Sequence, residues 1–142
     1  MAFLWSDAWL LQAIGLAAYR GPATLAEIIG AADAVNHALP TDDELHGGLV
    51  RLTAGGFVEE VESRFRLTDK VPPKAAATIA ESGWQRGRRV AAELLKSEEW
   101  SAATNVRDPR NQVIYPGLTE DRIRAADEEY RQRVSRARTR KE

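Results

Sequence analysis

The stretch from Thr41 to Leu67 reads TDDELHGGLVRLTAGGFVEEVESRFRL and decides the fold. Thr41 is a typical N-cap residue, and three acidic residues follow it in the first turn, where the helix dipole favours negative charge. Leucines then recur at helical spacing and predict a buried stripe: Leu45, Leu49 and Leu52. The pair Gly55-Gly56 predicts the end of the helix, because glycine adopts the left-handed C-cap conformation without a Cβ clash. After the glycines the period changes to two, which predicts a β-hairpin.

Two further helices are predicted upstream of this stretch. Ser6 is the expected N-cap of a first helix that runs to about Tyr19 and carries a broad apolar face. Thr24 to Glu27 has the T-x-x-E form of a capping box and predicts the start of the second helix. A turn ending at Pro40 then leads into the third helix. The predicted order is helix, helix, turn, helix and hairpin.

This order, from Trp9 to Asp69, resembles a winged helix-turn-helix domain. The run LVRLTAGGFV (49–58) is similar to the end of the recognition helix in regulators of the MarR and PadR families. Residues 65–68 (FRLT) resemble the strand that closes the wing in those regulators, and residues 32–45 (ADAVNHALPTDDEL) are similar to uncharacterised bacterial winged-helix proteins. The resemblance implies a mainly α fold with a small β-hairpin, a winged helix-turn-helix domain over residues 1–70, and a dimeric DNA-binding transcriptional regulator.

The composition changes after Val71-Pro72-Pro73, and residues 71–142 are predicted to form a helical extension for packing or dimerisation. Two helices are expected, an alanine-rich one from Lys74 to about Trp100 and one capped by Thr119, with a loop over residues 102–117. Gly83 and Gly87 either allow close helix packing or break the first of these helices. The chain ends in a basic tail from Arg131 onward.

Charge is unevenly distributed along the chain. Residues 1–70 carry five basic and ten acidic side chains, a balance of −5, whereas residues 71–142 carry fifteen and eleven, a balance of +4. DNA affinity comes largely from neutralising phosphates, so an acidic N-terminal half has the wrong sign for easy DNA binding.

Two functions therefore compete. In the first, the chain binds double-stranded DNA through the third helix and the wing, with the basic tail assisting, and the candidate contacts are Thr41, His46, Arg51, Arg64 and Arg66. Against it, Gly47 and Gly48 offer no side chain, and Asp42, Asp43 and Glu44 would repel phosphates. In the second, the winged helix is a protein–protein interaction module that presents the acidic third helix to a partner. The first requires positive potential around this helix and the wing, and the second requires negative potential there.

A homodimer is implied by the resemblance, since helices outside the winged domain carry the dimer interface in similar regulators. The apolar groups assigned to that interface are the aromatic N-terminus and a thin stripe on the last helix: Phe3, Trp5, Trp9, Ile123, Tyr130 and Val134. The cluster Arg86, Arg88 and Arg89 beside Trp84 is interpreted as an exposed helix face.

Catalysis, cofactors and membrane insertion are not expected. The chain has no cysteine and two histidines, His37 and His46, which do not specify a metal site. No nucleophile–base pairing, phosphate-binding loop or dinucleotide fingerprint occurs. Asp7 and Gln12 interrupt the apolar start of the chain, which favours a buried amphipathic helix over a membrane or export segment. The expected setting is the cytoplasm.

Overall fold

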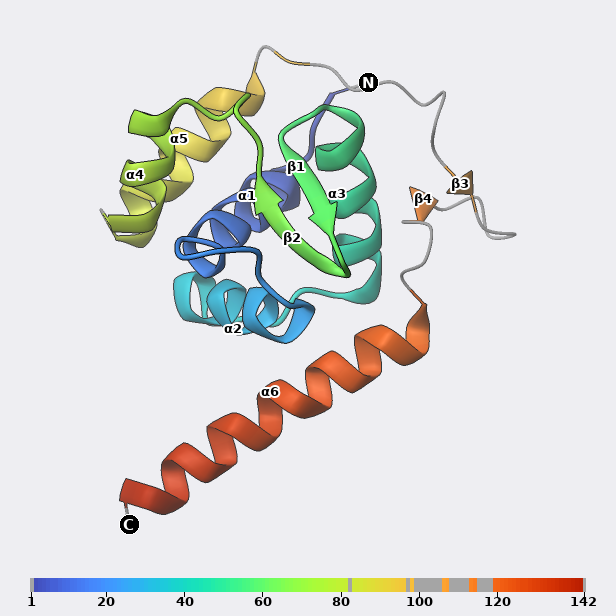
Figure 1. Ribbon diagram of the computed structural model, residues 1–142, viewed down its shortest axis with the longest axis vertical. Helices are drawn as coiled ribbons and strands as arrows, with labels where there is room; N and C mark the ends of the chain where they lie inside the picture. The colour runs from blue at the N-terminus through green and yellow to red at the C-terminus, as the bar shows by residue number, and fades with distance from the viewer. Residues whose placement is uncertain are drawn as a thin grey trace.

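The N-terminal half follows the predicted order of helix, helix, turn, helix and hairpin (Figure 1). The computed structural model describes residues 2–81, 83–96, 98, 106–107, 113–114 and 119–141, with the backbone alone at 106–107, 113–114, 120 and 139–141. Within these residues the fold is mainly helical. The helices are α1 (Trp5–Ala17), α2 (Leu25–Asn36), α3 (Asp42–Ala54), α4 (Pro73–Glu81), α5 (Trp84–Lys96) and α6 (Glu120–Lys141). The strands are β1 (Val58–Val61), β2 (Arg64–Leu67), β3 (Val106–Arg107) and β4 (Val113–Ile114).

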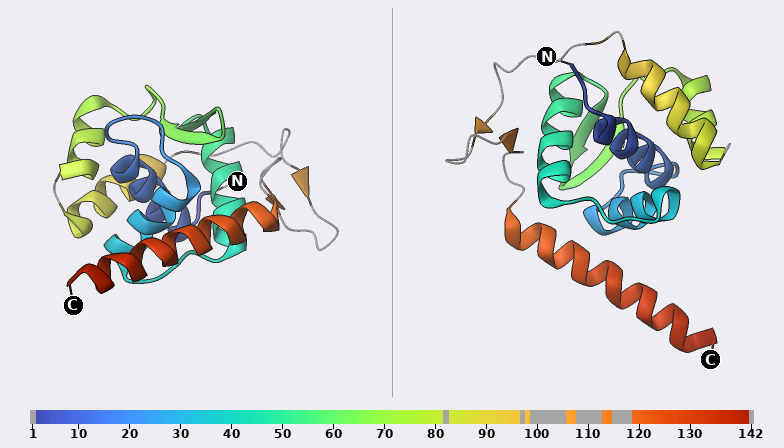
Figure 2. Two further views of the ribbon diagram at one scale, coloured as in Figure 1. Left: turned by 60° about the horizontal axis from the view of Figure 1, so that its bottom comes forward. Right: turned by 180° about the vertical axis from the view of Figure 1, so that it is seen from behind.

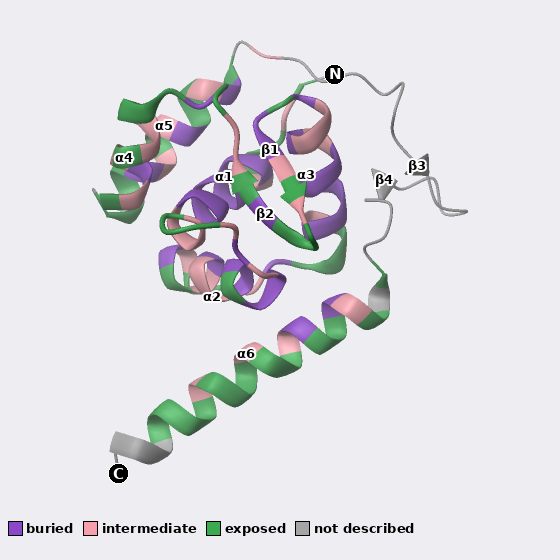
Figure 3. Cartoon of the chain, viewed as in Figure 1, coloured by how far each residue is buried: buried purple, intermediate pink, exposed green. Residues whose placement is uncertain are grey.

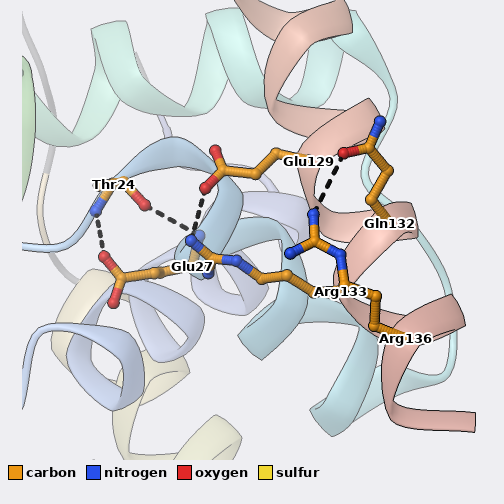
Figure 4. Close-up of polar contacts among 6 residues, drawn as sticks. All are labelled: Thr24, Glu27, Glu129, Gln132, Arg133 and Arg136. Carbon is orange, nitrogen blue, oxygen red and sulfur yellow. Dashed lines mark hydrogen bonds and ion pairs between the residues drawn. The ribbon is translucent and has the colours of Figure 1, made fainter.

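The predicted capping box at Thr24 and the predicted N-cap at Thr41 are confirmed. The Thr24 hydroxyl accepts from the Glu27 amide at 3.2 Å, and the Glu27 carboxylate accepts from the Thr24 amide at 3.0 Å (Figure 4). Thr41 and Glu44 repeat this exchange at the start of α3, at 3.2 and 2.9 Å. The backbone amide of Thr24 is the main reason why the pKa of Glu27 is lowered. Each box satisfies donors that a helix start leaves without partners.

The predicted Ser6 cap of α1 is wrong. The helix begins at Trp5 with Leu4 in the N-cap position, and the Asp7 carboxylate accepts the Leu4 amide at 2.7 Å. The cap is therefore supplied from inside the helix, by an acid in its first turn, and Ser6 lies within the helix.

The glycine stop and the hairpin form as predicted. Gly56 has φ +83°, and β1 then pairs antiparallel with β2, with Val58 opposite Leu67 and Val61 opposite Arg64. The connection between α1 and α2 joins the hairpin as well, because Ala23 and Phe65 exchange both backbone hydrogen bonds at 2.8 Å. Strand β2 also contacts α1, and β1 contacts α3. The Phe65 side chain is buried.

Helix α1 is the centre of the molecule. It contacts α2, α3, α4, α5 and β2, and all its residues from Asp7 to Gly15 are buried (Figures 1 and 3). A helix that is covered on every side must be apolar on every side, which explains the broad apolar pattern of this segment. The helices after residue 70 share this core, since Ile79, Ala91 and Leu95 belong to the same buried cluster.

The single alanine-rich helix predicted for residues 74–100 is two helices. Gly83 has φ +81° and separates α4 from α5, so three helices follow the hairpin instead of two. Gly87 has the packing role instead: a Cβ there would lie 2.9 Å from Gln12 Nε2 and 3.3 Å from the Ile79 carbonyl oxygen. Gln12 in turn donates to the Trp84 carbonyl at 2.7 Å, which fixes the start of α5 against α1. The loop predicted at 102–117 lies mostly outside the described residues, apart from the paired β3 and β4.

Helix α6 is long and lies along α2 (Figure 2). Thr119 accepts from the Arg122 amide at 3.2 Å, which confirms its predicted cap. Ile123 and Ala126 are buried, and the Tyr130 ring fills the space over Gly30, where a Cβ would come within 2.9 Å of it. The Tyr130 hydroxyl donates to Asp33 Oδ2 at 2.6 Å. The helix continues to Lys141, so the basic tail is helical.

We expect Tyr130 to report the docking of α6 on α2. Donation to Asp33, followed by burial, raises its pKa from 10.0 to about 12. Since the raised pKa favours the neutral phenol in the folded state, its contribution to stability is complete below pH 10.0 and is lost as the pH rises through about 12. Subtracting the ultraviolet tyrosinate titration of Tyr130→Phe from that of the parent isolates this group. Ionisation at the ordinary tyrosine pKa would contradict the docked geometry.

Candidate functional site

Arg51, a predicted DNA contact, is held inside the protein. Its Nε and Nη2 donate to Asp7 Oδ2 and Oδ1 at 2.7 and 2.9 Å. The Asp7 side chain is 0% exposed and that of Arg51 is 11% exposed. Asp7 also accepts the Leu4 amide, so one carboxylate joins α1, α3 and the N-terminal segment. Arg51 therefore does not present its charge on the outer surface of α3.

Gly47 and Gly48 make this ion pair possible. A Cβ on Gly47 would lie 2.8 Å from Arg51 Nη1, so the bare backbone leaves room for the guanidinium to fold back along α3. A Cβ on Gly48 would lie 2.5 Å from Leu10 Cδ2, so this glycine lets α3 approach α1 closely. From the sequence alone, these glycines are interpreted only as positions that offer no side chain to DNA bases. The signal that points to their packing role is Asp7, since an acid in an apolar helix needs a partner.

The remaining candidates on α3 do not form a basic surface. His46 is buried, and the backbone of β4 lies against α3. Thr41 is exposed, but its neighbours Asp42 and Asp43 are exposed as well. The accessible start of α3 is therefore acidic.

The two arginines of the hairpin differ in their surroundings. Arg66 Nε lies 2.6 Å from Glu59 Oε1 across the strands, with both side chains about half exposed. Arg64 is exposed, and together with Arg133 of α6 it contributes to lowering the pKa of Glu27. Among the five predicted DNA contacts, Arg51 and Arg66 are in ion pairs, and His46 is buried. Thr41 is exposed but uncharged. Arg64 is the remaining cation, and it is exposed.

Most residues assigned to a dimer interface have contacts within their own chain. Trp9 is buried, and its indole donates to the Ala32 carbonyl at 3.0 Å. Ile123 and Tyr130 pack on α2, and Phe3 is half-buried with its ring edge-on to Phe57. Val134 is half-buried and lines a cavity of about 490 Å³ between α2 and α6. Trp5 differs from the rest, because it is 58% exposed.

Trp5 belongs to an exposed aromatic surface that the sequence did not predict. We define the Trp5–Trp84 surface as Leu4, Trp5, Trp84 and Arg88. Leu4 is 53% exposed and Trp84 is 50% exposed. The guanidinium carbon of Arg88 lies 4.9 Å from the Trp5 ring centroid and 5.7 Å from that of Trp84. Arg88 Nη2 also donates to Asn36 Oδ1 at 3.1 Å, and burial lowers the Arg88 pKa.

A groove of about 390 Å³ continues from this surface between the N-terminal segment and α5. Residues 2–5 and Ala8 form one wall, and the other wall consists of Ala92, Glu93, Leu95 and Lys96. Arg88, expected on a plain exposed helix face with Arg86 and Arg89, is half-buried beside Trp5, which lines this groove. The described residues contain no cluster of three or more potential metal ligands.

We expect the Asp7–Arg51 pair to dominate the response of the core to substitution. Arg51→Met leaves a buried carboxylate without its partner and should lower the free energy of unfolding by about 3–5 kcal/mol. The double variant Asp7→Leu/Arg51→Met should recover part of this loss, because no buried charge remains. Urea unfolding followed by circular dichroism measures both.

Arg66→Met is the matched control for that experiment. It removes an arginine from an ion pair whose partners are about half exposed, so its cost should stay below about 1 kcal/mol. Equal losses for Arg51→Met and Arg66→Met would contradict the buried pair.

Comparison with known proteins does not identify a relative. No family model, curated protein or solved structure matches the chain. No helix in the described part of the chain is long and apolar enough to cross a membrane.

Proposed function

We propose that this chain is a winged-helix protein-interaction module that does not read DNA with its third helix. The order of α1, α2, α3 and the hairpin, with the α1–α2 connection paired to β2, supports the winged-helix assignment. The observation that carries the function is the position of Arg51. It is the one arginine or lysine of α3, and it is bound to Asp7.

A helix without an available cation is poorly suited to a DNA groove. Side chains that read bases with high affinity are arginine, lysine, asparagine and glutamine. The exposed side chains at the start of α3 are instead Thr41, Asp42 and Asp43, and two carboxylates facing phosphates oppose binding. Asp127 of α6 lies near this negative region: burial raises its pKa, and the charge of Asp42 raises it further.

The exposed surface of the chain suits protein contacts better. Tryptophan and arginine are enriched in the residues that dominate protein–protein binding energy. Trp5, Trp84 and Arg88 supply both on the Trp5–Trp84 surface, with the exposed Leu4 beside them. The partner is a second copy of this chain or another protein.

DNA binding through the wing and α6 is the second candidate function. The exposed Arg64 favours it, as do the arginines of α6 from Arg131 to Arg138. Contacts from these arginines to phosphates would position the chain on a duplex.

Fluorescence anisotropy of a labelled mixed-sequence duplex separates the two functions. At near-physiological salt we expect no saturable binding tighter than roughly 1 μM, a value at the strong end for non-specific complexes. Any binding at low salt should disappear in Arg136→Glu/Arg138→Glu and persist in Arg64→Glu. The proposal fails if the duplex binds at near-physiological salt and Arg64→Glu weakens that binding tenfold or more.

A further inference from the structure

We propose that the groove between the N-terminal segment and α5 is the docking site for an acidic amphipathic helix of a partner protein. The inference rests on the proposed function and names the partner class. It is carried by the shape, the charge and the rigidity of the groove.

The groove is lined mostly by apolar side chains, and Glu93 and Lys96 are its two charged lining residues. Leu4 and Trp5 line one wall, and Ala92 and Leu95 line the other. Its volume of about 390 Å³ falls at the small end of the roughly 300–1,000 Å³ that ligand pockets occupy. It lies beside the C-terminal end of α5, which lines it from Ala92 to Lys96 over roughly one helical turn. A partner helix that lays a row of apolar side chains into such a groove is a common recognition mode.

The charge around the groove selects an acidic partner. Helix α5 carries four basic side chains and one acidic one, Glu93. Lys96 lines the groove together with Glu93, Arg88 lies over the ring of the lining residue Trp5, and Arg89 is exposed on the same helix. Carboxylates flanking the apolar row of a partner helix would meet these cations, and complementary charge raises the association rate and the specificity.

Arg88 keeps the aromatic end of the groove in place. Its guanidinium lies over both indoles and is itself anchored to Asn36 at the end of α2. Trp5 also contacts the buried Trp9, with ring centroids 5.9 Å apart. Two half-exposed tryptophans are thus ordered before a partner arrives, which lowers the entropic cost of binding.

These features favour a protein over a single-stranded nucleic acid. Nucleic acid strands bind by stacking bases on open aromatic faces along a cationic track. Here Arg88 lies over a face of each indole, and the adjoining groove has leucine and alanine side chains beside Phe3 and Trp5. The aliphatic part of the groove accepts apolar side chains of a peptide and offers no stacking platform.

A random peptide library displayed on phage, selected against the full chain, provides the probe. We expect the recovered peptides to combine large apolar residues at three- and four-residue spacing with aspartate or glutamate. The recovered peptide, synthesised with a fluorescent label, is then titrated with the parent and with single variants. Trp5→Ala and Lys96→Glu should each weaken its binding by about tenfold or more. Lys96 is exposed, so the second substitution tests the groove without altering the core.

Tyr19→Ala is the matched control. Tyr19 is as exposed as Trp5 but lies beyond the other end of α1, and its substitution should leave peptide binding unchanged. The proposal is overturned if no peptide is enriched, if the enriched peptides lack acidic residues, or if Tyr19→Ala and Trp5→Ala have equal effects. It is also overturned if Trp5→Ala instead abolishes binding of a labelled single-stranded oligonucleotide, or converts a dimer to a monomer in sedimentation velocity.

The peptide titration and the duplex titration test different proposals, so their outcomes can be told apart. Duplex binding that depends on Arg64, together with peptide binding that depends on Trp5, would favour the second candidate function, DNA binding through the wing, and would retain the groove. Absence of both kinds of binding would reject the groove alone.

Discussion

The buried ion pair between Asp7 and Arg51 is the interaction on which the arrangement of the molecule depends. Removing both charges from water is costly, and the pair is tolerated because the contact is bidentate and Asp7 accepts a third hydrogen bond from Leu4. It also requires two adjacent positions without side chains, Gly47 and Gly48. Such a pair defines one position of α3 along α1, since a shift of one residue would leave a buried carboxylate unpaired.

The same pair connects the core to the exposed groove. Asp7 holds the Leu4 amide, and Leu4 and Trp5 form a wall of that groove. Gln12, one turn further along α1, holds the start of α5 through the Trp84 carbonyl. Two buried polar residues of a single helix therefore position both walls. This explains why α1 carries polar groups in an otherwise apolar segment, and why the aromatic side chains at the surface are ordered.

Local signals in the sequence were sufficient to predict the helices of the N-terminal half and the hairpin. They did not predict which residues far apart in the chain are partners. Thr24 forms its predicted capping box and Thr41 its predicted N-cap, because each involves residues three apart. Asp7 and Arg51 are separated by 44 residues, and Tyr130 and Asp33 by 97, so no periodicity links them. Without that link, Arg51 looked like a DNA contact and the α6 stripe looked like a dimer interface. Gly83 and Gly87 have the same propensity, and only their neighbours decide that one breaks the helix and the other packs.

The uneven charge of the chain is partly balanced inside the molecule. Docking of α6 brings Arg133 close enough to lower the pKa of Glu27 in the acidic half. The same docking partly buries Asp127, which raises its pKa, and the charge of Asp42 adds to that increase. The basic excess of the C-terminal half therefore does not by itself indicate a nucleic-acid partner. The cations of α5 differ, because they lie beside exposed indoles and an apolar groove, where a partner's carboxylates and apolar side chains can bind together.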